Sequence, residues 1–217
     1  EDNADAAEAA REAAKLFKKA GDSRKMAKAL QVGAEATLSE EAADEAIAMA
    51  ERAHMIFQQA GDRDGQAGAM VTMANLFNAV GDFDKATYRA EAAAELYKKL
   101  GASSEAAATL RTAALVFLDK RQYDPSAGLG VARDAVRTAT SSVRLYEAAG
   151  EGTGADYAGS LQTLASAFLA TEEWDKAMAQ AAQSKEIFQT LDHSVGAASA
   201  LNTIAQVYHK KGDNFEA

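Results

Sequence analysis

The sequence predicts an all-α protein built as a row of stacked helix pairs, and three observations lead to this prediction. A glycine-containing motif returns every 40 residues, because residues 16–22, 56–62 and 96–101 have nearly the same sequence. Periods of this length are typical of helical repeats that pack only against their neighbours. Alanine, the strongest helix former, dominates the apolar residues, while the runs of Val, Ile and Thr that are typical of strands are missing.

Two columns of residues alternate along the chain and divide each repeat into two helices. One column holds Phe17, Phe57, Tyr97, Tyr146 and Phe188. The other holds Thr37, Phe77, Phe117, Phe168 and Tyr208, each three residues after an alanine. Most steps between columns are 20 residues, enough for one helix and a short turn. We interpret both columns as core rather than as a cofactor or ligand site, because each buried ring contributes about 1.5–3 kcal/mol.

The helices are predicted in order along the chain. We expect a capping half-repeat at 4–20, helix pairs at 24–38 with 41–60, 64–80 with 84–100, 104–121 with 125–149 and 155–171 with 174–191, and a last helix at 195–211. N-cap residues precede several of these helices, at Asp22, Asp62, Ser103 and Asp124. Glycines suited to a left-handed C-cap end the helices before them, at Gly21, Gly61, Gly101 and Gly150.

The whole chain is expected to form a single array. Its parts are the half-repeat 1–20, the helix pairs 24–60, 64–100, 104–150 and 155–191, and the start of a further repeat at 195–217.

The third repeat carries nine additional residues, because Phe117 and Tyr146 are 29 apart. At about 100° per residue, nine residues would turn an uninterrupted helix half a turn out of phase. We therefore expect a break at residues 126–130, with a loop or short turn after Pro125 and a long helix from about Val131. This insertion is either a tolerated surface feature or a contact specific to a partner.

Composition and charge exclude several classes of protein. The net charge of −9 disfavours a nucleic-acid surface, which needs clustered Lys and Arg. The apolar stretches are too short to span a bilayer, so we expect a soluble, acidic protein with no direct membrane insertion. With no cysteine, disulfides and Cys-ligated zinc are absent and the redox compartment is undetermined. Localisation stays unknown: cytoplasmic is the default, and an organelle stroma or matrix is left open because the chain does not begin with Met.

The repeats resemble the tetratricopeptide repeat (TPR). The best match runs from Met73-Ala74 and Phe77 through the turn at residues 81–85 to Ala86, and further copies begin at Leu164-Ala165 and Ile204-Ala205. The period of about 40 is similar to that of the long-repeat members, kinesin light chains and soluble NSF attachment proteins, between which we do not choose. The resemblance implies a right-handed superhelical solenoid of antiparallel helix pairs.

The resemblance also implies where a partner binds, since the first helix of each TPR pair lines a concave groove. The polar residues that we select on these helices as peptide- or partner-binding candidates are Gln31, Thr72, Asn75, Asn78, Arg111, Thr112, Gln162, Thr163, Asn202, Thr203 and Gln206. Amides donate and accept, so such residues can pair with the backbone of an extended peptide. Alternatively, these residues bind no partner and only keep the face of the first helices hydrated. A basic clamp for a peptide carboxylate is not expected, because Lys28, Arg111 and Lys210 lie in separate repeats.

No catalytic constellation is predicted. His54, His193 and His209 are isolated, and the glycine-rich segments 128–130 and 150–154 follow no strand and lack the Lys-Ser/Thr of a phosphate loop. We therefore expect no enzyme activity, no cofactor, no metal site and no small-molecule substrate.

Three classes of function remain. The first is a non-catalytic scaffold that binds a partner protein or an extended peptide through the first helices of its pairs. The second is a structural subunit packed into a large assembly through its outer face and the 118–146 insertion. The third, an enzyme or ligand carrier, is the least supported by the residues.

Overall fold

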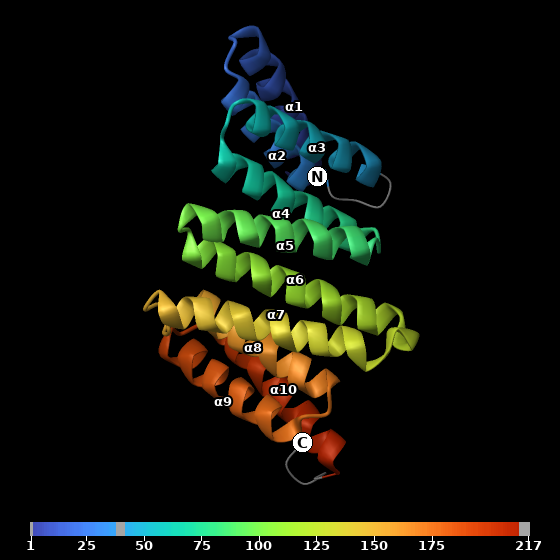
Figure 1. The fold of residues 1–217 in the computed structure, drawn as a ribbon, viewed down its shortest axis with the longest axis vertical. Coiled ribbons are helices and arrows are strands. Elements are labelled where there is room, and N and C mark those ends of the chain that lie inside the picture. The colour runs from blue at the N-terminus through green and yellow to red at the C-terminus, as the bar shows by residue number, and fades with distance from the viewer. Residues whose placement is uncertain (1, 38–41, 213–217) are drawn as a thin grey trace. The chain divides into compact units, whose positions relative to one another are not determined.

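The computed structural model describes residues 2–37 and 42–212, which form ten α-helices (Figure 1). Their bounds are α1 Asp2–Lys19, α2 Ser23–Ala36, α3 Ala43–Gln59, α4 Arg63–Ala79, α5 Phe83–Leu100, α6 Ser103–Tyr123, α7 Gly128–Ala148, α8 Ala155–Ala170, α9 Trp174–Thr190 and α10 Ser194–Lys211. These described residues contain no strand, so the all-α prediction is confirmed. The start of a further repeat, predicted after residue 212, lies outside the described residues.

Several helix ends carry the predicted caps. The carboxylates of Asp22 and Asp62 accept hydrogen bonds from the backbone N–H of Lys25 and Gly65, at 3.0 and 2.9 Å. Gly101 ends α5 in the left-handed region at φ 74°, where glycine has no Cβ to clash. Two predicted N-caps differ. Ser103 is the first residue of α6 rather than its cap, and Asp124 caps the short 3-10 turn Pro125–Ala127 rather than the long helix that follows.

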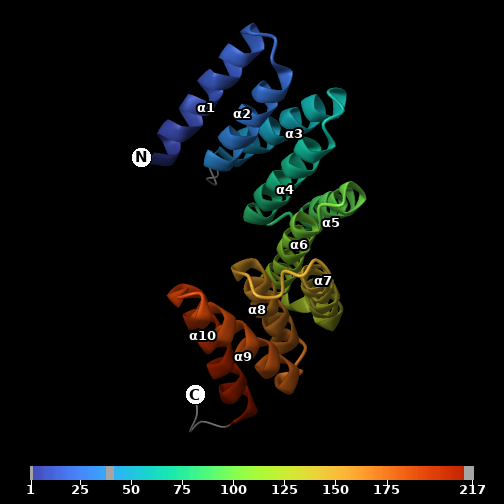
Figure 2. The same ribbon diagram turned by 90° about the vertical axis from the view of Figure 1, so that its left-hand side faces the viewer.

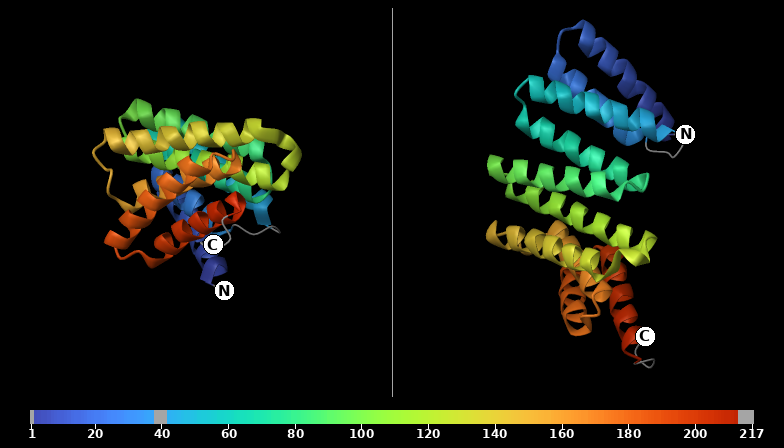
Figure 3. Two further views of the ribbon diagram at one scale, coloured as in Figure 1. Left: turned by 90° about the horizontal axis from the view of Figure 1, so that it is seen from below. Right: turned by 45° about the vertical axis from the view of Figure 1, so that its right-hand side comes forward.

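The helices form two compact units, residues 1–102 and 103–217. In the first unit α1 to α5 each pack on the next helix, and α2 also packs on α4 (Figure 2). In the second unit α6 to α10 do the same, and α6 and α10 both pack on α8 (Figure 3). Alternate helices, which we call A helices, therefore contact one another directly: α2 and α4 in the first unit, and α6, α8 and α10 in the second. The helices between them, with α1, are called B helices. One continuous right-handed array over 1–217 stays a prediction.

Alanines and rings make up the core of each unit, as expected. Phe57, Tyr97, Tyr146 and Phe188 are buried, while Phe117 and Phe168 are half-buried. One turn before these B-helix rings lies a fully buried small residue: Ala53, Ala93, Ser142 or Ser184. The two serines donate to A-helix carbonyls, Ser142 to Ala107 at 2.7 Å and Ser184 to Ala158 at 2.8 Å. Small residues at this position let the B helix approach the A-helix backbone closely.

The insertion in the third repeat lengthens two helices instead of forming a projecting loop. Both α6 and α7 have 21 residues, whereas α4 has 17 and α5 has 18. Between them lies only the 3-10 turn η2, Pro125–Ala127, whose N-cap is Asp124. The predicted break at 126–130 is thus wrong for residues 128–130, which already belong to α7. Arg121 Nη1 donates to the carbonyl of Gly128 at 2.9 Å and joins the end of α6 to the start of α7.

Among the described residues, no helix combines the length and apolar character needed to cross a bilayer.

Candidate functional site

All eleven candidate binding residues lie on A helices, but they differ in exposure. Asn75, Asn202 and Gln206 are exposed; Asn78, Arg111, Thr112 and Gln162 are half-buried; Gln31, Thr72, Thr163 and Thr203 are buried. The predicted face is therefore divided into residues that water reaches and residues that other helices cover.

In the first unit, a hydrogen-bonded cluster of the buried Gln31 and Thr72 with the exposed Glu35 joins α2 to α4. Gln31 Nε2 donates to Thr72 Oγ1 and to Glu35 Oε1, both at 3.1 Å. The Thr72 hydroxyl in turn lies 2.7 Å from Glu35 Oε1 and 3.2 Å from the carbonyl of Gly68. Gln31 and Thr72 are 6% and 2% exposed, so their polar groups serve the contact between neighbouring A helices.

The second unit repeats this device between α8 and α10. Gln162 Nε2 donates to Thr203 Oγ1 at 2.6 Å and lies 3.4 Å from the carbonyl of Ser199. The separation of Gln162 and Thr203 is 41 residues, the same as that of Gln31 and Thr72. We call these two pairs the amide–threonine links. Sequence reasoning placed their four residues on a binding face, and the signal that it missed is this repeated separation.

The threonine hydroxyls of this column also form hydrogen bonds within their own helices. The hydroxyls of Thr112, Thr163 and Thr203 lie 3.3, 3.0 and 3.4 Å from the carbonyls four residues before them. This bond is available to any helical threonine and needs no partner protein. The column thus has a structural explanation in each unit.

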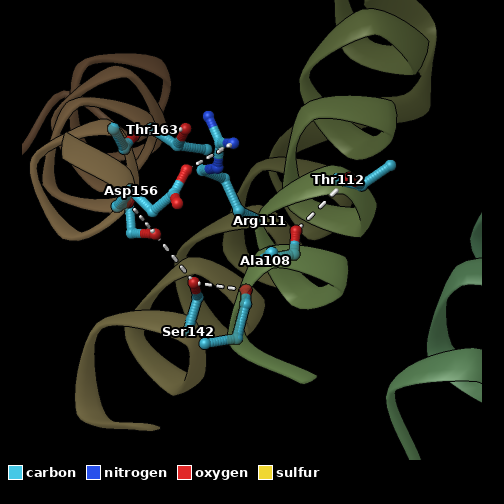
Figure 4. Close-up of polar contacts among 9 residues, drawn as sticks. Ala108, Arg111, Thr112, Ser142, Asp156 and Thr163 are labelled. Carbon is cyan, nitrogen blue, oxygen red and sulfur yellow. Dashed lines mark hydrogen bonds and ion pairs between the residues drawn. The ribbon is translucent and has the colours of Figure 1, made fainter. Parts of the chain in front are cut away.

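Arg111 takes the place of the linking amide on α6 (Figure 4). Its Nη2 lies 3.8 Å from Asp156 Oδ1, and its Nη1 lies 3.0 Å from where a Cβ on Gly159 would stand. The Arg111 side chain is thus laid over the first turns of α8, where a residue larger than glycine would displace it. Because Asp156 is largely exposed, this ion pair contributes little to stability.

The candidate residues that water reaches on the A helices are mainly amides. Asn75 lies on α4, and Asn202 and Gln206 lie one turn apart on α10. Two exposed aliphatic side chains, Val195 and Leu201, lie on α10, with Leu201 next to Asn202. Both helices offer donors and acceptors to solvent, and on α10 they lie beside apolar surface.

A small hydroxyl cluster and two tyrosines join α6, α7 and α8. The hydroxyls of Ser142 and Ser160 are 3.0 Å apart, and each has a backbone carbonyl as acceptor (Figure 4). Tyr146 packs edge-on against Tyr157, with ring centroids 6.5 Å apart. Burial raises the pKa of Tyr146 to about 12, and the nearby Asp156 carboxylate adds to this. Burial also raises the pKa of Tyr157, whose hydroxyl donates to Glu147. Both phenols are neutral at pH 7.

His54 and His193 have structural positions. Burial lowers the pKa of His54, whose Nε2 lies 3.3 Å from Gln66 Nε2. His193 is the N-cap of α10, where its Nδ1 accepts a hydrogen bond from the backbone N–H of Gly196 at 3.0 Å. In the part of the chain that the structure describes, no three His, Asp or Glu side chains are grouped to hold a metal ion.

Comparisons with known proteins agree with this arrangement of helices. The model of a family described as soluble NSF attachment protein, SNAP, matches residues 1–129. The crystal structure of BtubC (BKLC) from P. vanneervenii is similar over 99% of this chain and 85% of its own, with a TM-score of 0.81 and 18% sequence identity. A comparison with curated proteins finds no match.

Two structures of a putative kinesin light chain from Podosopora anserina, with nearly identical TPR-like repeats, are also similar. Their TM-scores are 0.63 and 0.61 at 14% and 15% identity, over 85% and 84% of this chain and 95% of each of theirs. The predicted TPR-like fold is therefore confirmed.

Proposed function

Because the chain belongs to the soluble NSF attachment protein (SNAP) family, we propose that it is a non-catalytic scaffold that binds a partner protein or an extended peptide. TPR-like folds generally mediate protein–protein interaction, since stacked helix pairs present extended surfaces rather than enclosed reaction sites. Each unit has its own proposed contact surface on the exposed part of its A helices: Asn75 in the first unit, and Asn202 and Gln206 in the second.

The observation that carries this proposal is the division of the amides into two sets. Gln31 and Gln162 use their amides between helices, whereas Asn75, Asn202 and Gln206 expose theirs to water. An exposed side-chain amide offers two donors and an acceptor, which can pair with the N–H and C=O groups of an extended peptide. Each of the two surfaces therefore fits a partner recognised mainly by its backbone.

Amide substitutions with matched controls test this function. A partner is first isolated by affinity purification on the full chain and identified by mass spectrometry, and its Kd is then measured with purified proteins. Asn75→Ala and Asn202→Ala are expected to weaken binding at least tenfold together. Gln58→Ala and Gln189→Ala remove exposed amides from the B helices α3 and α9 and are expected to leave the Kd unchanged. Equal loss in both pairs would refute the assignment to the A helices.

A second function, that of a structural subunit in a large assembly, is favoured by the end of the long hairpin formed by α6 and α7. Tyr123, 79% exposed, and Leu129, also exposed, stand on either side of η2. Two large apolar side chains at one exposed turn are suited to burial against another protein. If Tyr123→Ser and Leu129→Ser abolish binding while Asn75→Ala and Asn202→Ala do not, the subunit function replaces the scaffold proposal.

A further inference from the structure

A cavity of about 290 Å³ lies between the B helices α1 and α3 of the first unit, and the A helix α2 contributes to its wall. Its apolar residues are Ala14, Leu30 and Met49, which are buried, and Met26, which is half-buried. A cavity of about 150 Å³ holds benzene, so this one has room for about ten to twelve heavy atoms. The cavity is therefore large enough for a small ligand with an apolar body.

The charged side chains of the cavity are mostly basic. Arg11, Lys15 and Lys18 come from α1 and Arg52 from α3, and among the described residues that line the cavity Glu45 is the only acid. Arg11 Nε lies 3.0 Å from Glu45 Oε1, so these two charges neutralise each other. Lys15, Lys18 and Arg52 are exposed and form no hydrogen bond or ion pair with the described residues. We call them the three unpaired bases, and they surround an apolar cavity in a chain whose net charge is −9.

The next repeat carries larger polar side chains at two positions of the cavity. Forty residues after Ala14 and Met26 stand His54 and Gln66. The His54 side chain is half-buried, and its Nε2 lies 3.3 Å from Gln66 Nε2, which joins α3 to α4. The small Ala14 and the apolar Met26 make no such polar contact between α1 and α2. The space in the first repeat is therefore a feature of its own residues and not of the repeat.

The three unpaired bases are also specific to the first repeat. Forty residues later their positions are occupied by Met55, Gln58 and Ala92. Bases that only kept the outer surface of the B helices hydrated would not need to be gathered at the one repeat whose cavity lacks the histidine. Their position beside this cavity indicates an anionic ligand.

A preceding helix of the same array does not account for the cavity. The next groove between B helices, formed by α3 and α5, also contains a cavity, of about 420 Å³. The helices that precede it, α1 and α2, contribute no residue to its lining and leave it open. A further repeat before α1 would leave the groove between α1 and α3 open in the same way. The second cavity is lined by both signs of charge: Asp44, Glu51 and Asp82 with Lys85 and Arg89.

We propose that the cavity between α1 and α3 binds a small amphiphilic anion, with a hydrocarbon chain of about eight carbons and an acidic headgroup. The chain lies against Met26 and Met49, whose flexible side chains adapt to an apolar ligand. The headgroup, a carboxylate or a phosphate, lies among the three unpaired bases. This site is separate from the exposed amides of the A helices, and none of the eleven candidate binding residues lines it.

The size of the cavity favours a small ligand over a partner helix. With a diameter of about 10 Å and a pitch of 5.4 Å, one turn of a helix with its side chains occupies roughly 420 Å³. This is more than the cavity holds. A helix would therefore cover the cavity without filling it, whereas an eight-carbon chain fills it.

The test uses octanoate, octyl phosphate and octyltrimethylammonium as probes of similar length. Their binding to the full chain is measured by isothermal titration calorimetry, below the concentrations at which they form micelles. At least one of the two anions is expected to bind tenfold or more tightly than the cation, and the tighter anion identifies the headgroup. Lys15→Ala combined with Arg52→Ala is expected to weaken that anion at least tenfold. The matched control, Lys19→Ala combined with Arg63→Ala, removes two exposed bases that do not line the cavity and is expected to leave the Kd unchanged.

A second variant fills the cavity instead of changing its charge. Ala14→His combined with Met26→Gln introduces the pair found at His54 and Gln66 and is expected to abolish anion binding. A thermal melt verifies that this variant is folded. The charge variants concern exposed side chains, so the test stands without it.

Three results would overturn the proposal. The first is a cation that binds as tightly as both anions, and the second is equal weakening by the charge variant and its control, because binding would then be unspecific. The third is that no amphiphile binds while Lys15→Ala combined with Arg52→Ala weakens a partner protein, because an acidic segment of that protein would then be the occupant. None of these variants changes Asn75 or Asn202, so the outcome is distinguishable from that of the partner-binding experiment.

Discussion

Replacing Thr203 by valine separates an internal role of this residue from a role in binding. Valine keeps the shape and the β-branch but lacks the hydroxyl that accepts from Gln162 Nε2 at 2.6 Å. Thr203 is 4% exposed, so water does not replace the lost acceptor from its side. If the amide–threonine links stabilise the contact between A helices, the free energy of unfolding of the valine variant is lower by the contribution of the hydrogen bond that Gln162 loses.

The structure sets the size of this effect. The remaining acceptor for Gln162 Nε2 is the carbonyl of Ser199 at 3.4 Å, a weak hydrogen bond. A half-buried amide that loses its main partner costs about 1 kcal/mol. In a Gln162→Leu background no amide is left to lose a partner, so Thr203→Val is expected to cost less than about 0.3 kcal/mol there. The coupling between the two residues is therefore expected to be about 0.7–1 kcal/mol.

Urea unfolding measures the cycle, with the fluorescence of Trp174 as the probe. Trp174 is the single tryptophan of the chain and begins α9, in the same unit as Gln162 and Thr203. With a slope of about 1–3 kcal/mol/M, a loss of about 1 kcal/mol lowers the urea midpoint by roughly 0.3–1 M. Equal costs of Thr203→Val in both backgrounds would refute the link. Partner binding that is lost while stability is unchanged would make Thr203 a contact residue after all.

Two further predictions concern the core. Gly196→Ala is expected to lower the free energy of unfolding in urea by about 1–3 kcal/mol, because the added Cβ would lie 2.5 Å from the ring of Phe188. Gly130→Ala in α7 is the control: its Cβ meets no atom within 4 Å, and it is expected to raise the free energy of unfolding by about 0.5–1 kcal/mol. Tyr146→Phe is expected to raise the pH of alkaline unfolding: with its folded pKa raised from 10.0 to about 12, Tyr146 favours the folded state below pH 10, and this contribution is lost between pH 10 and 12. If an absorbance titration finds as many late-ionising tyrosines in the variant as in the unchanged protein, the prediction for Tyr146 is wrong.

The sequence predicts the helices well because their signals are local. Glycine in the left-handed region at Gly21 and Gly61, followed by a capping aspartate, needs only a few neighbouring residues to act, so these ends lie where the pattern places them. The aromatic columns are equally local in origin, since the helical period alone puts Phe77 and Phe57 on buried faces. Element type and approximate bounds follow directly from such features.

The third repeat shows where local reasoning fails. Nine added residues would turn an uninterrupted helix half a turn out of phase, and a break with a loop or short turn was therefore predicted at residues 126–130, where Gly128 and Gly130 also have low helix propensity. Instead, Pro125 and Asp124 start η2 earlier, Gly128 turns the chain at φ 72°, and the helix continues through Gly130 because the long helix α7 packs on α6. Tertiary packing outweighs the propensity of two glycines, and no pattern within the segment carries that information.

The candidate site was predicted at the level of helices but not of individual side chains. A helical period places Gln31, Thr72 and Asn75 on the same general face, yet it gives no angle between neighbouring A helices, which depends on how the B helices pack between them. That angle decides that Gln31 reaches Thr72 while Asn75 stays exposed. A difference of one helix turn thus separates an internal contact from a surface that a partner can use.

Asn202 also differs from Asn75 in its surroundings. Leu201, which is next to Asn202 on α10, is 49% exposed, whereas α4 has no exposed large apolar side chain among the described residues. A partner can therefore bury apolar surface beside the Asn202 amide. We expect Asn202→Ala to weaken binding more than Asn75→Ala, as the Kd of each single variant will show.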